Sequence, residues 1–176
     1  LYSQELPVDY LTPNFHFERR NEVRKMMPKN SVAVYFSNPV RNRANDVNYH
    51  YHQDSNFYYL TGLKEPNSLL LIFKDPQYID NIETNEVLFV QERNPSKEQW
   101  DGYRLGVSGA KKKLKVNHVM YNSDFKNLKI DFGLFYKVLF FNFHNDVRDD
   151  IRNPNDLFSL IEDFKDKIKY SDDYSS

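Results

Sequence analysis

The chain has 176 residues, a length that fits one domain with a sizeable core and leaves no room for a second full domain. Its 24 basic and 25 acidic residues give a formal charge of −1, which excludes a strong overall attraction to nucleic acid or to an anionic membrane. The sequence has no cysteine and no apolar run long enough to span a membrane, so we exclude disulfides and thiol catalysis and expect a cytoplasmic protein.

The first half of the chain predicts one helix and then a set of strands. Thr12 is a helix N-cap candidate and Pro13 suits the first helical position, so a helix is expected from there to near Pro28. Short apolar runs rich in β-branched and aromatic residues predict strands at 31–37, 57–60 and 68–74. The polar stretch 41–54 is expected to be a surface segment, and Gly62 with residues 65–67 is expected to form a turn.

The second half of the chain alternates between apolar patterns typical of strands and apolar patterns typical of helices. Ser96 and Gln99 match a capping box, which predicts a helix that begins close to Trp100. Apolar patterns predict the other elements: strands at 87–91, 118–121 and 137–144, helices at 108–115 and 156–168, and a looser helical or irregular piece at 124–136. We expect one domain over 1–170, a frayed tail at 171–176, and an α/β fold with a mixed sheet of five or six strands and helices on both faces.

The stretch 41–63 is the most unusual part of the sequence, because many polar side chains run directly into a burst of aromatic ones. His50 and His52 stand two residues apart, and Asp46 or Asp54 could add a third ligand for a metal. Surface hydrogen bonding explains the same residues and is the favoured interpretation. Nucleophile-elbow, phosphate-loop and dinucleotide-binding glycine motifs are absent, so the residue chemistry predicts no catalytic centre.

Trp100 is the only tryptophan, and it lies in the segment E-Q-W-D-G-Y-R-L-G. A lone tryptophan is usually a core residue. Its polar neighbours and the glycines at 102 and 106 leave a second interpretation open, in which an exposed aromatic side chain lies on a loop near a pocket.

Three separate segments carry a family resemblance. They read F-E-R-R-N-E-V, then R-N-R-A-N-D-V-N-Y-H-Y-H-Q-D-S-N-F-Y-Y-L-T-G-L-K-E-P-N-S-L-L-L, and finally L-F-V-Q-E-R-N-P-S-K-E-Q-W-D-G-Y-R-L-G. Together they resemble the N-terminal domain of aminopeptidase P, the Xaa-Pro aminopeptidase of the creatinase-like, "pita-bread" metallopeptidases. The likeness covers residues 15–106 at motif level and implies a ribonuclease H-like sheet.

The resemblance implies a second, catalytic domain that this chain lacks. In the family that domain holds two metal ions, usually manganese, which activate water to cleave the bond between a first residue and proline. We therefore expect no cofactor in this chain, and we expect the chain to be an excised domain or a natural stand-alone fragment that is inactive by itself.

The resemblance also implies which residues handle substrate. Asp46 and Trp100 match family positions that line the substrate pocket, where a carboxylate can hold a free amino group and an indole can cover a proline ring. Three arginines are expected to orient these loops or to meet the substrate carboxylate: Arg41, Arg43 and Arg104.

Three functions remain open at this point. The first is a non-catalytic domain that supplies pocket walls and contacts within a homodimer or tetramer, with its own catalytic domain and Xaa-Pro peptides as partners. The second is a stand-alone binding or adaptor module of the same fold. The third is a small metal hydrolase built on His50, His52 and an aspartate.

Overall fold

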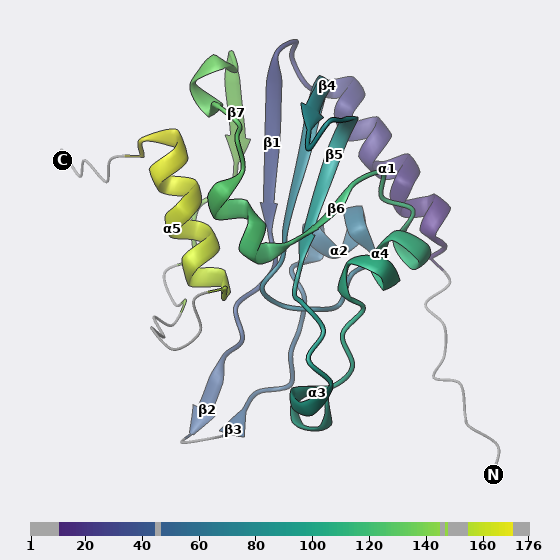
Figure 1. Ribbon diagram of the computed structural model, residues 1–176, viewed down its shortest axis with the longest axis vertical. Coiled ribbons are helices and arrows are strands. Elements are labelled where there is room, and N and C mark those ends of the chain that lie inside the picture. The colour runs from purple at the N-terminus through teal and green to yellow at the C-terminus, as the bar shows by residue number, and fades with distance from the viewer. Residues whose placement is uncertain (1–10, 45–46, 145–146, 148–154, 171–176) are drawn as a thin grey trace.

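A mixed β-sheet lies at the centre of the fold (Figure 1). The structure, a computed structural model, describes residues 11–44, 47–144, 147 and 155–170. Within these ranges the main sheet has five strands, which are, in spatial order, β6 (Val119–Tyr121), β5 (Ile82–Val90), β4 (Leu69–Ile79), β1 (Ser31–Phe36) and β7 (Lys137–Phe140). The expected mixed sheet of five or six strands is thus confirmed.

The central strands are antiparallel and the edge strands are parallel to their neighbours. β4 pairs antiparallel with both β1 and β5, whereas β7 runs parallel to β1 and β6 runs parallel to β5. Asp80 and Asn81 connect β4 to β5 with φ angles of 49° and 61°. Positive φ at both central residues is the requirement of a tight type I′ hairpin, and Asp and Asn adopt it at low cost.

Helices cover both faces of the sheet, as predicted (Figure 1). One face packs against α1 (Pro13–Met26), α2 (Ser55–Thr61) and α4 (Gly106–Leu114). The other packs against α5 (Leu157–Ile168) and the two 3₁₀ helices η1 (Asn122–Asn127) and η2 (Phe132–Leu134). Alternate residues of β4 and β5 supply the two cores, and no described helix is both long and apolar enough to cross a bilayer.

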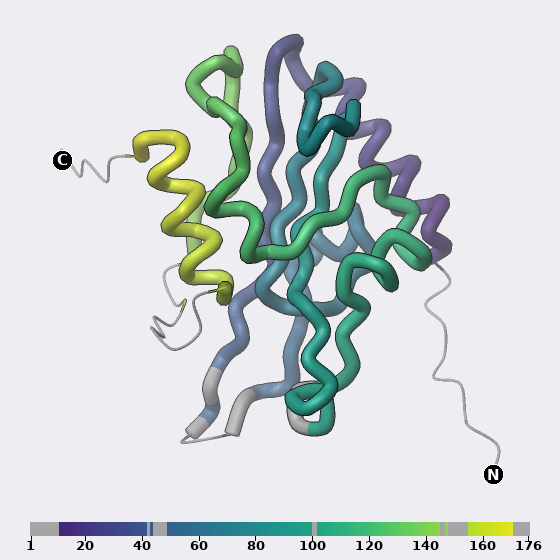
Figure 2. The backbone as a smooth tube through the Cα atoms, in the orientation of Figure 1, coloured from purple at the N-terminus to yellow at the C-terminus, as the bar shows by residue number. Residues whose placement is uncertain are grey.

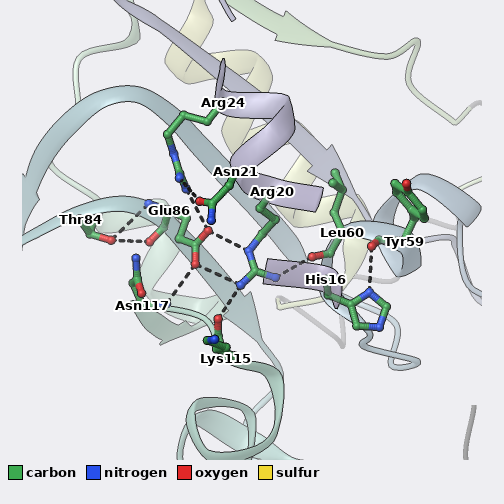
Figure 3. A network of polar contacts seen from close by, with 10 residues as sticks. All are labelled: His16, Arg20, Asn21, Arg24, Tyr59, Leu60, Thr84, Glu86, Lys115 and Asn117. Atoms are coloured by element: carbon green, nitrogen blue, oxygen red, sulfur yellow. Dashed lines mark hydrogen bonds and ion pairs between the residues drawn. The ribbon is translucent and has the colours of Figure 1, made fainter. Parts of the chain in front are cut away.

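A buried ion pair ties α1 to the sheet (Figure 3). Arg20 Nε and Nη2 donate to Glu86 Oε2 and Oε1 at 2.8 and 3.2 Å, and both side chains are fully buried. The remaining guanidinium donors reach the carbonyls of Leu60 at 2.7 Å and Lys115 at 2.5 Å. Arg20 therefore joins α1 to the end of α2, to β5 and to the chain just beyond α4.

The strand predicted at 57–60 is wrong, because these residues form part of helix α2. Asp54 caps the helix, with Oδ1 accepting the backbone N–H of Phe57 at 2.8 Å. Gly62 ends it in the left-handed conformation at φ 72°. Buried Phe57 and Leu60 lie three residues apart on the inner face of the helix. The two caps outweigh the β propensity of the aromatic residues.

Three smaller predictions also need correction. Helix α3 (Pro95–Asp101) is capped by Asn94, whose Oδ1 accepts the backbone N–H of Lys97 at 3.3 Å, so Ser96 is not the N-cap. The polar stretch after residue 41 contains a small hairpin of β2 (Asn42–Ala44) and β3 (Val47–Asn48). The last predicted strand ends at Phe140 instead of 144. The expected tail at 171–176 lies outside the described residues.

Candidate functional site

Two segments extend beyond the same end of the main sheet (Figures 1 and 2). We call residues 38–53, which contain β2 and β3, the hairpin arm, and residues 91–105, which contain α3, the α3 arm. All five candidate substrate residues belong to these two arms. The fold therefore brings to one end of the molecule two regions that are far apart in the sequence.

The positions of the five candidates are only partly described. Arg41 and Arg43 have exposed side chains on the hairpin arm, and Arg104 is half-buried at the end of the α3 arm. Asp46 lies outside the described residues. Trp100 belongs to helix α3, and its side chain lies outside the described part. Whether these side chains meet around a substrate stays a prediction.

Gln53 closes the base of the hairpin arm. Its Oε1 accepts the backbone N–H of Asn38 at 3.0 Å and the phenol O–H of Tyr51 at 2.8 Å. Its Nε2 donates to the carbonyls of Leu63 at 3.2 Å and Glu65 at 2.8 Å. Burial raises the pKa of Tyr51, so its hydroxyl stays a donor near neutral pH. One amide side chain thus joins the two ends of the arm and ties them to residues 63–65.

The α3 arm is held at both of its ends. At its start, Gln91 Nε2 donates to the carbonyl of Pro66 at 3.0 Å, and Asn67 Nδ2 donates to Gln91 Oε1 at 3.3 Å. At its end, Leu105 N donates to Glu65 Oε1 at 2.7 Å. The partners at both ends come from the turn that precedes β4.

An ion pair inside the α3 arm shapes the segment around the helix. Arg93 binds Glu98 with two hydrogen bonds, of 3.0 and 2.9 Å, and its guanidinium carbon lies 4.6 Å from the ring centre of Tyr103. The bonds from Arg93 are the main reason that the pKa of Glu98 is lowered. Gly106 follows at φ 60°, and a Cβ there would come within 2.9 Å of the Arg93 side chain.

The metal hypothesis gains no support from the described residues. The rings of His50 and His52 meet edge to face with centres 5.3 Å apart. Asp54 Oδ1 is engaged as the cap of α2. Across the part of the chain that the structure describes, no group of three or more His, Cys, Asp or Glu side chains could hold a metal ion.

Two surface hollows lie away from the arms. One of about 420 Å³ runs along α1 beside Arg24 and Lys74, and another of about 550 Å³ lies by the β4–β5 hairpin near Tyr78 and Met120. Neither is lined by a candidate substrate residue.

Sequence reasoning missed the residues that hold the arms. Gln53, Glu65 and Gln91 lie in the segments that carry the family resemblance, but sequence reasoning assigned them no role, and the partners that define their role lie 10 to 40 positions away. The available signal was the E-P-N turn at 65–67, which was predicted as a turn but not as an attachment point.

A family match agrees with the fold and with the two arms, and together they define the class of protein. The family model for the aminopeptidase P N-terminal domain matches residues 16–131, which include both arms. This chain belongs to that family. It is therefore an N-terminal domain of the aminopeptidase P type, and the resemblance noted in the sequence is confirmed.

Individual relatives agree with the family assignment. The chain is 40% identical over 108 residues to an Xaa-Pro aminopeptidase of Haemophilus influenzae, covering 61% of this chain and 24% of that protein. It is 34% identical over 110 residues to human Xaa-Pro aminopeptidase 3, covering 62% of this chain and 21% of the human protein. The chain thus matches between a fifth and a quarter of the length of these relatives.

A solved structure of Escherichia coli aminopeptidase P in its low-pH form superposes with a TM-score of 0.67 at 25% identity. The match covers 93% of this chain and 34% of the E. coli chain. A second solved structure is the zinc-substituted E. coli enzyme in complex with product, with a TM-score of 0.65 at 25% identity over 90% of this chain and 33% of that chain.

Proposed function

We propose that this chain is the non-catalytic N-terminal domain of an Xaa-Pro aminopeptidase and that its two arms form walls of the substrate pocket. The observation that carries the proposal is the family match over 16–131, which includes both arms, combined with their extension from one end of the sheet. Loops held on a rigid sheet commonly carry binding residues.

The chemistry of the candidate residues suits a short peptide with a free N-terminus. The carboxylate of Asp46 pairs with the peptide's amino group, and the indole of Trp100 covers the proline ring and excludes water. Arginine donors fit a carboxylate in a bidentate manner, which suits the other end of a short substrate. The arginines concerned are Arg41, Arg43 and Arg104.

Bond cleavage belongs to a domain outside this chain. When bound there, two manganese ions supply an activated water and polarise the scissile carbonyl. This domain contributes substrate contacts and surfaces for assembly into a homodimer or tetramer. The zinc-substituted E. coli relative in complex with product supports metal-dependent cleavage by the longer enzymes of this family.

The test compares two proteins. One is the 176-residue chain, and the other is the product of the reading frame continued past Ser176. Both are incubated with an Xaa-Pro peptide and manganese, and release of the first residue is measured. We expect a folded but inactive chain and an active longer protein. Metal-dependent release by the 176-residue chain would contradict the proposal, and a longer frame that lacks a metallopeptidase domain would favour the adaptor function.

A further inference from the structure

We propose that the turn at residues 63–67, here called the anchor turn, fixes the two arms relative to each other and that Glu65 is the positioning residue of the α3 arm. The relevance to substrate rests on the proposed function. The positioning itself does not, because it follows from contacts among described residues.

Glu65 joins the two arms directly. Its backbone carbonyl accepts Gln53 Nε2 of the hairpin arm at 2.8 Å, and its side-chain Oε1 accepts the backbone N–H of Leu105 in the α3 arm at 2.7 Å. The carbonyl of neighbouring Pro66 accepts a hydrogen bond from Gln91 Nε2, at the other end of the α3 arm, at 3.0 Å. Contacts on consecutive residues leave little freedom for one arm to move without the other.

The anchor turn is itself held to the sheet and to the helical layer that contains η1 and α5. Asn67 has a positive φ of 55°, and its carbonyl accepts Nδ2 of Asn122 at 3.0 Å. Its Oδ1 accepts the backbone N–H of Leu157 at the start of α5, also at 3.0 Å. Ser68 N donates to Ser37 Oγ at 3.0 Å where β4 begins. The arms are therefore attached to a point that the sheet, η1 and α5 all fix.

The burial of Glu65 argues for a specific role. The residue is 7% exposed, and Oε2 has no hydrogen-bond partner among the described residues. A buried carboxylate with one unpaired oxygen costs free energy that an apolar residue would not cost. The hydrogen bond that the Glu65 carboxylate accepts from Leu105 holds the end of the α3 arm. The geometry therefore points to positioning of the α3 arm as the function that offsets this cost.

Trp100 makes the proposal directly measurable, because the only tryptophan of the sequence lies within the α3 arm. Fluorescence anisotropy and acrylamide quenching of the 176-residue chain report on this arm without an activity assay. Glu65→Gln keeps an acceptor oxygen for Leu105, whereas Glu65→Ala removes it. Glu83→Ala, at an exposed glutamate in β5, is the matched control.

We expect Glu65→Ala to lower the anisotropy and raise the quenching constant, and we expect Glu65→Gln and Glu83→Ala to match the unmodified chain. Unchanged fluorescence in a folded Glu65→Ala protein would overturn the proposal. If Glu65→Ala does not fold, Gln91→Ala releases the other end of the arm and is expected to give the same fluorescence change. Unfolding of both variants would also overturn it, since both residues would then be core stabilisers.

The same variants separate this proposal from the proposed function. In the longer protein, a mobile Trp100 together with normal Xaa-Pro turnover would leave the positioning role of Glu65 intact and would refute the substrate role of the arm. Unchanged fluorescence together with lost turnover would refute the positioning role of Glu65 and would leave the substrate role of the arm intact.

Discussion

Arg20 and Glu86, which lie 66 positions apart, form an ion pair that is fully buried between α1 and β5, with Nε 2.8 Å from Oε2. Arg24 adds a contact to the same carboxylate at 3.2 Å. Glu86 Oε1 also accepts the backbone N–H of Asn117 at 3.2 Å. Such a network holds the helical layer in a defined position on the sheet that carries both arms.

Breaking this pair is expected to destabilise the domain strongly. Arg20→Ala leaves the Glu86 carboxylate buried with much of its compensation removed, which typically costs about 3–5 kcal/mol. Urea unfolding followed by circular dichroism measures the loss. Lys25→Ala, which breaks the exposed Lys25–Glu22 pair at 2.7 Å on the same helix, is the control and is expected to change little. Equal effects of the two substitutions would contradict this role for Arg20.

A second prediction concerns the end of α2. Gly62 has a φ of 72°, and a Cβ there would come within 2.8 Å of the buried His16 ring. Gly62→Ala is therefore expected to destabilise the domain by more than the roughly 1–2 kcal/mol of backbone strain alone. Asn81 also has a positive φ, of 61°, and lies exposed in the turn between β4 and β5. Asn81→Ala introduces backbone strain of the same kind without an approach to His16, so it is the control, and thermal unfolding that ranks it equal to Gly62→Ala would exclude a steric clash at His16.

The two carboxylates at the α3 arm are expected to give opposite pH dependence. Burial raises the pKa of Glu65 above its ordinary value of 4.5, so the stability associated with its protonated form is lost as pH rises through the raised pKa. The bonds from Arg93 lower the pKa of Glu98, so its contribution is present above 4.5 and is lost as pH falls through the lowered pKa.

Urea unfolding across the acidic range tests both directions. Relative to the unmodified chain, Glu65→Gln is expected to gain stability as pH rises from 4.5 to neutrality. Glu98→Gln is expected to lose relative stability as pH rises through the acid range up to 4.5. A constant difference for Glu65→Gln across this range would mean that its carboxylate ionises as it does in the unfolded chain.

The sequence predicted the elements that local signals define. Thr12 and Pro13 marked the start of α1, and the apolar spacing from Leu157 onward marked α5. The prediction was wrong at 57–60, where Phe and Tyr have a high β propensity. Caps at Asp54 and Gly62 favour a helix there instead, and their effect outweighs the local propensity only in the folded chain.

The candidate site shows the same division between local and long-range information. Family motifs pointed to the two arms, which the fold places at one end of the sheet. The anchor turn could not be assigned from sequence, because Glu65 and Leu105 are 40 positions apart and neither belongs to a periodic pattern. Long-range hydrogen bonds of buried polar residues depend on the tertiary fold and leave no local signature.

The measurement that tests the pocket-wall proposal most directly is kcat/KM for an Xaa-Pro peptide, measured in a full-length enzyme that contains this domain. Trp100→Ala is expected to lower kcat/KM by about 10-fold or more while leaving the unfolding of this domain nearly unchanged. Tyr103→Ala, at an exposed aromatic residue of the same arm, is expected to retain most of the activity. Unchanged kcat/KM in Trp100→Ala, or loss of folding in that variant, would contradict the role of the α3 arm as a substrate wall.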